Sequence, residues 1–253
     1  MSIKDIFLVT LFAVATTDLT AMEQSDALTA EAKVEVRVNS TVYAFEQLPT
    51  LTEVLEPVAL KQQWYWPASK LFRLNTVSLE PQRQALLTKL QHIASTSTPE
   101  QQNVLLALQA EVSGWQLAER VPITVDYDLA RIAPAKNPRF TPGTYQLLLN
   151  ERPSYLSFVG AISSSVRLAY QPATSLNEYI KNIRLSSFVD TANLYVVKPN
   201  GEVVKAGVQL WQSSQLQPEP GAMVIIPFQV GWLSDEMAEI NELLITLAVN
   251  RVY

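Results

Sequence analysis

YLSFVGAISSSVRLAYQPATSLNEYIKNI, residues 155–183, contains two strand patterns followed by the start of a helix. The apolar segments 155–161 and 166–170 have the length and the branched or aromatic content of short strands. Ser175 is followed three residues later by Glu178, a pair that can cap a helix by bonding to each other's backbone N–H groups. We therefore expect two strands and then a capped helix.

Further strands are expected after this helix. They comprise residues 194–197, 203–204 and 223–228, and Pro199-Asn200-Gly201 provides the turn between the first two. Two strands, one helix and then more strands is the order of a β-grasp (ubiquitin-like) module, an α+β fold. Since Arg152-Pro153 breaks the preceding pattern, the module is expected over residues 153–229.

The N-terminal part of the chain repeats this order. Val34, Val36 and Val38 alternate with polar residues, which is typical of a half-buried strand, and Asn39-Ser40 forms a turn. The other expected elements are a strand at 42–45, a short helix at 51–55 and strands at 123–129 and 143–149. These patterns predict a first β-grasp module over residues 34–150.

A helical pair is expected inside this first module. Thr98 can cap a helix, Pro99 suits its first position, and Gln101 completes the capping pair. Pro81 can start a partner helix, so that the two form an antiparallel hairpin. The expected apolar stripes are Leu86, Leu90 and Ile93 on one helix, and Val104, Leu105, Leu108 and Val112 on the other. We expect a helical insertion over residues 64–118.

The last segment, residues 233–252, has the pattern of an amphipathic helix. Ser234 can cap it, and its apolar seam comprises Leu233, Met237, Ile240, Leu244 and Leu247. The opposite face is acidic, whereas a membrane-surface helix would carry Lys and Arg there. Packing on the adjacent domain is favoured, and a groove in a partner protein stays open. The expected fold class is α+β: two β-grasp domains, a helical-hairpin insertion in the first, and this helix.

The first residues have the layout of a secretory signal peptide. Lys4 precedes the apolar run 6–15, which is about half the length of a membrane span, and small or polar residues follow to Ala21. A buried strand or helix is the alternative interpretation. We expect residues 1–21 to be removed on export to the periplasm, leaving no membrane span.

Composition limits the chemistry available to the chain. With 19 Lys and Arg against 24 Asp and Glu, the formal net charge is −5, which argues against a nucleic-acid partner. The chain has no Cys and one His, His92, so neither a thiol nucleophile nor a multi-histidine metal site is expected, and no cofactor. Asp126 and Asp128 would share a strand face about 6–7 Å apart, a separation that suits an inverting glycosidase. Two solvated carboxylates are the favoured interpretation, so no catalytic residue is assigned.

Several short segments occur in the order found in one protein family. They are Trp64-Tyr65-Trp66-Pro67, Arg120-Val121-Pro122, Val125-Asp126, Pro142-Gly143-Thr144-Tyr145, Arg152-Pro153, Gly160-Ala161, Leu210-Trp211 and 218–221 (PEPG). In this ordered set the chain resembles the capsule-biosynthesis GfcC family of periplasmic proteins. The resemblance implies the fold expected above and kinship with the β-grasp domains of Wza-type outer-membrane polysaccharide export proteins. One departure is Ser163-Ser164-Ser165, where the module more often carries glycine.

Five residues are candidates for ligand binding. Aromatic faces stack on sugar rings, so Trp64, Trp66 and Trp115 could hold a glycan, although tryptophans more often fasten an insertion to its parent domain. The resemblance implies that Arg120 lines a cleft beside the insertion, and an ordinary salt bridge to a neighbouring carboxylate is the alternative. Asp126 is the carboxylate that could hold sugar hydroxyls there.

Two functions stay open on these grounds. One is a non-enzymatic, monomeric accessory protein of capsule or exopolysaccharide assembly or export, which binds polysaccharide or an outer-membrane polysaccharide export protein. The other is a polysaccharide-modifying enzyme that uses the Arg120 cleft and its nearby carboxylates. The expected solvation of those carboxylates and the lack of a nucleophile favour the accessory protein.

Overall fold

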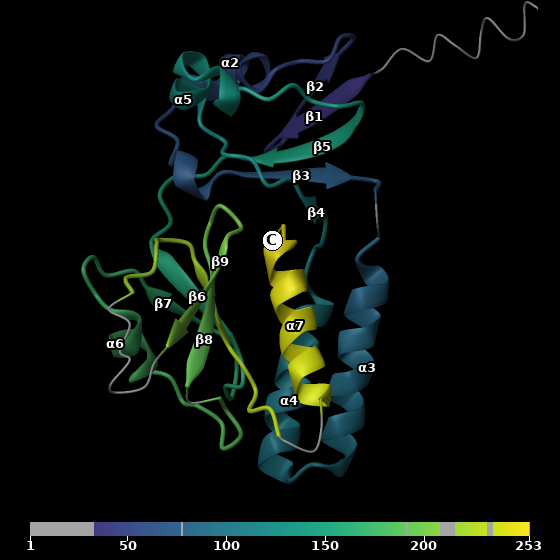
Figure 1. Cartoon of the computed structure of the whole chain (residues 1–253), viewed down its shortest axis with the longest axis vertical. Coiled ribbons are helices and arrows are strands. Elements are labelled where there is room, and N and C mark those ends of the chain that lie inside the picture. The colour runs from purple at the N-terminus through teal and green to yellow at the C-terminus, as the bar shows by residue number, and fades with distance from the viewer. Residues whose placement is uncertain (1–32, 77, 191, 208–215, 232–234, 253) are drawn as a thin grey trace, which may run out of the picture.

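A computed structural model describes residues 33–76, 78–190, 192–207, 216–231 and 235–252. They form two five-stranded sheets, one above the other in Figure 1, and helices lie beside the lower sheet. The expected signal peptide, residues 1–21, lies outside the described residues, as do Leu233 and Ser234 at the start of the expected C-terminal helix.

The upper sheet belongs to the first domain. Its elements are β1 (Val34–Val38), β2 (Thr41–Phe45), α2 (Leu51–Ala59), the 3-10 turn η1 (Trp66–Ala68), β3 (Lys70–Leu74), β4 (Glu119–Arg120), α5 (Tyr127–Ile132), the 3-10 turn η2 (Pro134–Lys136) and β5 (Gly143–Leu148). The strand order is β2-β1-β5-β3-β4, with β1 and β5 parallel. The alternating Val34, Val36 and Val38 are at most 3% exposed, and α2 starts at a capping box of Thr50 and Glu53.

The lower sheet belongs to the second domain. Its elements are β6 (Tyr155–Gly160), β7 (Val166–Ala169), α6 (Leu176–Ile180), β8 (Asn193–Val197), β9 (Val203–Gly207) and β10 (Met223–Ile226). The strand order is β7-β6-β10-β8-β9, with β6 and β10 parallel. The expected capping box of Ser175 and Glu178 starts α6, and it buries Leu176 and Tyr179.

Both sheets have the same topology once the strands of each domain are numbered from one to five: 2-1-5-3-4, with the first and fifth strands parallel. The expected α+β fold with two β-grasp domains is therefore confirmed. Gly160 shows how closely the two parallel strands of the second domain approach each other. It has a φ of +114°, and a Cβ at this position would lie 2.1 Å from the carbonyl oxygen of Ile226, so only glycine fits.

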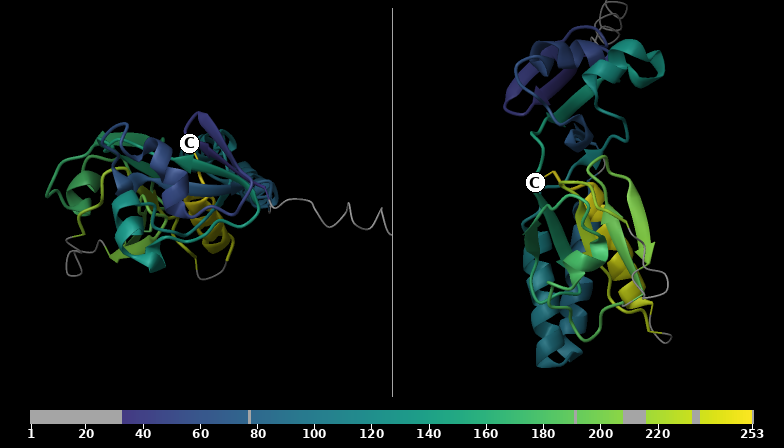
Figure 2. Two further views of the ribbon diagram at one scale, coloured as in Figure 1. Left: turned by 90° about the horizontal axis from the view of Figure 1, so that it is seen from above. Right: turned by 90° about the vertical axis from the view of Figure 1, so that its left-hand side faces the viewer.

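The helical insertion consists of α3 (Glu80–Thr96) and α4 (Pro99–Ser113), and the predicted capping box of Thr98 and Gln101 starts α4. Its buried residues join the core of the second domain rather than that of its parent domain: Leu86, Leu90, Ala94, Val104, Leu105, Leu108 and Val112. In the right view of Figure 2 the insertion extends away from the first sheet and along the second domain. A segment of the first domain thus completes the hydrophobic core of the second.

The C-terminal helix α7 (Glu236–Val249) packs one face into the protein. Ile240, Leu244 and Leu247 of the predicted seam are fully buried, between the second sheet and α3 (Figure 1). Lys89 on α3 forms an ion pair with Glu239 on α7. Packing on the adjacent domain is therefore confirmed, and the insertion supplies part of the surface. Within the described ranges, no helix has the length and apolar character needed to cross a membrane.

Two local predictions are wrong. The segment expected to be helical, 64–118, also contains β3, in which Leu71 and Phe72 are both buried. Because both faces of this strand are covered, its sequence lacks the polar alternation of a half-buried strand. The strand expected at 123–129 is instead a loop followed by α5, and the carboxylate of Asp126 caps that helix by accepting a hydrogen bond from the Leu129 N–H at 2.9 Å. Asp126 and Asp128 therefore do not share a strand face.

Candidate ligand-binding site

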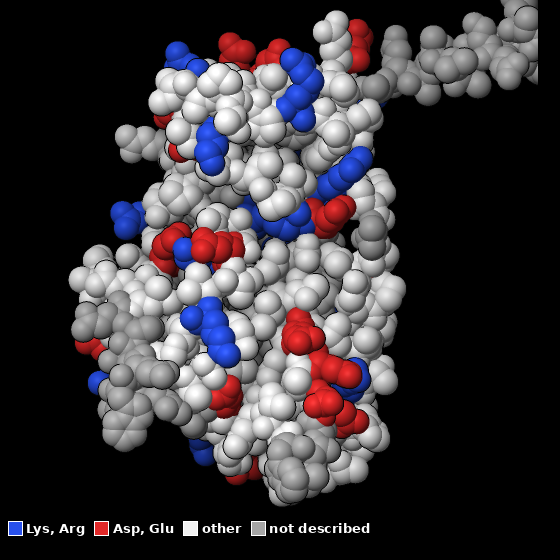
Figure 3. All heavy atoms as spheres, in the orientation of Figure 1, with Lys and Arg blue, Asp and Glu red and all other residues white. Residues whose placement is uncertain are grey.

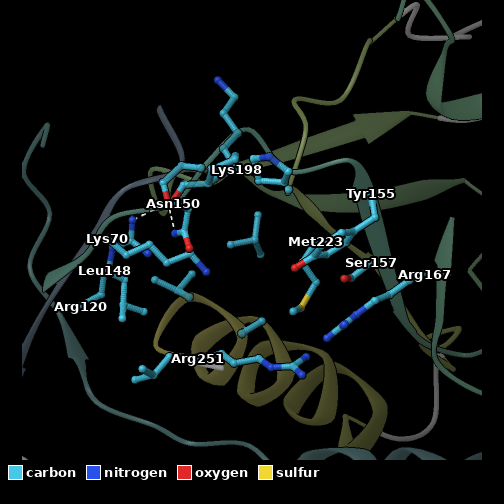
Figure 4. A pocket seen from close by; sticks show the side chains of 18 of the residues that line it. Lys70, Arg120, Leu148, Asn150, Tyr155, Ser157, Arg167, Lys198, Met223 and Arg251 are labelled. Atoms are coloured by element: carbon cyan, nitrogen blue, oxygen red, sulfur yellow. Dashed lines mark hydrogen bonds between the residues drawn. The ribbon is translucent and has the colours of Figure 1, made fainter. Parts of the chain in front are cut away.

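A cavity of about 360 Å³ lies where the two domains meet. Its walls come from β3, β4 and the end of β5 in the first domain, from β6, β7, β8 and β10 in the second, and from the residues that end α7. Figure 4 shows Lys70 and Arg120 on one side of the cavity and Tyr155, Ser157 and Arg167 on the other, with Arg251 beside α7. The site therefore forms only when the two domains are docked.

Arg120 reaches the cavity from β4 and links the two domains. Its Nη2 donates a hydrogen bond to the carbonyl oxygen of Pro199, in the turn between β8 and β9, at 2.7 Å. The guanidinium also lies over the Phe72 ring, with Cζ 5.2 Å from the ring centroid. Burial lowers the pKa of Arg120 to about 10, so the guanidinium stays charged at neutral pH. No salt bridge between Arg120 and a carboxylate forms among the described residues.

Lys70 enters the cavity from the neighbouring strand, β3. Burial, together with the positive charges of Arg120 and Arg251, lowers the pKa of its ammonium to about 8. The Lys70 ammonium has neither a hydrogen bond nor an ion pair with any described residue. A charge in this position is costly unless a counter-charge arrives.

Arg251 follows α7 and is held by the insertion. Its guanidinium forms an ion pair with Glu111 of α4 at 3.2 Å and lies over the Trp115 ring at 4.8 Å. Burial lowers its pKa, and Glu111 partly offsets that effect. The backbone after α7 pairs with the segment that leads into β4, because Val252 donates to the Gln116 carbonyl at 2.8 Å. The insertion therefore fixes this wall of the cavity.

Positive charge predominates in the lining. The basic residues are Lys70, Arg120, Arg167, Lys198 and Arg251, and the acidic residue is the exposed Glu151. Lys198 pairs with Glu202 at 2.8 Å, whereas Arg167 lies over the Tyr155 ring at 5.0 Å. In Figure 3, Lys and Arg side chains lie in the hollow between the two domains, with acidic side chains on either side of them. Such an arrangement suits a ligand that carries negative charge and hydrogen-bond acceptors.

Of the five candidate residues from the sequence, Arg120 lines this cavity and the other four do not. Trp64 packs on the first-domain core and donates from Nε1 to the Val58 carbonyl at 2.9 Å, and Trp66 also packs on that core. Trp115 is 3% exposed and donates to Glu111 at 3.0 Å. Asp126 is the cap of α5. The three tryptophans thus occupy structural positions in the two cores.

Sequence reasoning missed Lys70, Arg167 and Arg251 as cavity residues. Lys70 lies in β3, within the segment that the sequence predicts to be a helical insertion. Arg167 and Arg251 are distant from Arg120 along the chain and meet it only through domain docking. The one available signal was the segment Lys70-Leu71-Phe72-Arg73-Leu74, whose β-strand potential competes with the surrounding helical pattern.

Comparison with known proteins assigns the chain to a family. Residues 29–152 match the family described as "Capsule biosynthesis GfcC, N-terminal", and residues 164–253 match "Capsule biosynthesis GfcC C-terminal". The chain is also 28% identical over 177 residues to the "Uncharacterized protein YjbG" of Escherichia coli (strain K12). The aligned region covers 70% of this chain and 71% of that protein. The two domains, in this order, identify the chain as a member of the capsule biosynthesis GfcC family.

Proposed function

We propose that this protein is a non-enzymatic periplasmic accessory of capsule or exopolysaccharide assembly or export, and that it binds glycan in the cavity between its domains. Membership of the family supports a role in capsule biosynthesis. The observation that carries the binding role is the position of Arg120: a half-buried, charged guanidinium that joins the domains and lines a cavity of about 360 Å³. This volume lies within the range of about 300–1,000 Å³ that is usual for small-ligand sites.

A binding experiment with the native polymer tests the proposed glycan binding. The full chain is incubated with capsular polysaccharide from the same bacterium, and retention is measured by affinity electrophoresis. Arg120→Ala is expected to weaken retention, whereas Arg184→Ala, which removes an exposed arginine on the second domain, is the matched control. Both variants also receive a thermal melt, because Arg120 contributes to the domain contact. Equal retention by wild type and a folded Arg120→Ala variant would contradict glycan binding in the cavity.

The same incubation separates the accessory role from the enzyme alternative. A polysaccharide-modifying enzyme would shorten the polymer or release a substituent, and new reducing ends or a change in polymer mass would reveal it. We expect polymer recovered after prolonged incubation to be unchanged. A change that wild type produces and Arg120→Ala does not would establish the enzymatic alternative instead.

A further inference from the structure

Lys70, Phe72 and Arg120 lie on one face of the first sheet. Lys70 and Phe72 are two residues apart on β3, and Phe72 pairs with Arg120 on β4. Because side chains alternate along a strand, Leu71 points the other way, into the core of the first domain. The ammonium and the guanidinium therefore belong to the same wall of the cavity, as Figure 4 shows.

We propose that this wall binds an acidic group of the glycan, a carboxylate or a phosphate carried by a sugar, between Lys70 and Arg120. The inference rests on the proposed function and gives the chemical class of its ligand. A guanidinium presents donors in a planar fork that matches carboxylate and phosphate oxygens, and an ammonium adds a compact charge beside it.

The positive charges around Lys70 are only partly balanced by carboxylates, so an anion would be stabilised there. Arg120 approaches from β4 and Arg251 from the end of α7, and both positive charges act on Lys70. Arg251 is balanced by Glu111, and Lys198 by Glu202. On the opposite wall Arg167 adds a further cation, and the exposed Glu151 is the acidic residue of the lining. Lys70 and Arg120 receive no carboxylate from the described part of the chain.

Binding should be coupled to a proton. In the free protein the Lys70 pKa is about 8, so near pH 8.5 much of the population has a neutral amine. An anion in the cavity stabilises the charged form, so Lys70 takes up a proton when the ligand binds at this pH. Affinity should fall by up to about tenfold per pH unit above pH 8, because the unbound state then has to be protonated first.

Isothermal titration calorimetry of the full chain tests the assignment. The probes are trigalacturonate, its neutral methyl ester and galactose 1-phosphate, which separate a carboxylate source from a phosphate source. We expect an acidic probe to bind at least about tenfold more tightly than the ester, as is usual for hydrogen bonds to a charged group. At pH 8.5 the heat should depend on the ionisation enthalpy of the buffer, which reports proton uptake.

Lys70→Met is the informative variant, with Lys61→Met as the control at an exposed position. Met keeps the length and apolar stem of Lys without its charge. We expect Lys70→Met to weaken binding of the acidic probe by about tenfold, to abolish proton uptake and to raise the melting temperature, since an uncompensated charge is removed. A residue with a purely structural role would not produce this combination.

The outcomes separate this inference from the proposed function. Tight binding of either acidic probe with loss in Lys70→Met supports it. Equal binding of trigalacturonate and its ester, unchanged in Lys70→Met, together with no tight binding of galactose 1-phosphate, overturns the acidic-group assignment while glycan binding stands. If wild type binds neither acidic probe, the acidic-group assignment is also overturned, even where native polymer is retained. If wild type does not retain the native polymer at all, the proposed function itself fails, and this outcome is distinct from the failure of the acidic-group assignment.

Discussion

Leu244→Ala tests whether α7 is an integral part of the core. Leu244 is fully buried, in the cluster that combines the second sheet, α7 and the insertion. Replacing a buried leucine by alanine costs about 2–5 kcal/mol, because apolar contacts are lost and a cavity remains. For a chain of this size, about 2–4 °C of melting temperature correspond to each kcal/mol, so we expect a decrease of about 4–20 °C.

The assays are a thermal melt, which gives the melting temperature, and urea unfolding, which gives the free energy of unfolding, each followed by tryptophan fluorescence and circular dichroism. Glu242→Ala, at an exposed position two residues before Leu244, is the control for changes in the helix that leave the seam intact. We expect the control to stay within about 0.5 kcal/mol of wild type. A similar result for Leu244→Ala would refute the buried position of α7 and favour a helix reserved for a partner.

Three further predictions follow from individual residues. Asp126→Ala should cost about 1 kcal/mol of stability through loss of the α5 cap; polymer retention should be unchanged, and a loss of retention would return Asp126 to the binding site. In wild type, Lys70 loses its proton near pH 8 when folded and near pH 10.5 when unfolded, so its contribution to stability should rise with pH between these values. Urea midpoints across that range should show this rise in wild type but not in Lys70→Met, and parallel profiles would contradict it. Gly160→Ala should lower the melting temperature substantially, since its Cβ would lie 2.1 Å from a backbone oxygen; an unchanged melt would indicate that β6 and β10 can separate.

The helices α2, α3, α4, α6 and α7 could be predicted from the sequence because their signals are local, whereas the alternating apolar residues before and within α5 predicted a strand. Thr98 and Gln101, like Ser175 and Glu178, form capping boxes within four residues of chain, and the structure contains both. The seam of α7 is likewise encoded by the helical period. Strands were predictable where one face is polar, as in β1. The strand β3 was not predictable, because Leu71 and Phe72 are both buried and its sequence therefore lacks the alternation of polar and apolar residues.

The cavity was determined by tertiary structure. The sequence, through its family resemblance, pointed to Arg120 alone among the cavity residues. Lys70 shares a wall with Arg120 because β3 and β4 pair, and Arg167 and Arg251 face that wall because the insertion and α7 dock on the second domain. The shifted pKa of Lys70 has the same origin, since burial and neighbouring charge act through space and not along the chain. Capping and periodicity act between residues a few positions apart, whereas the charge environment of a site depends on which distant segments meet.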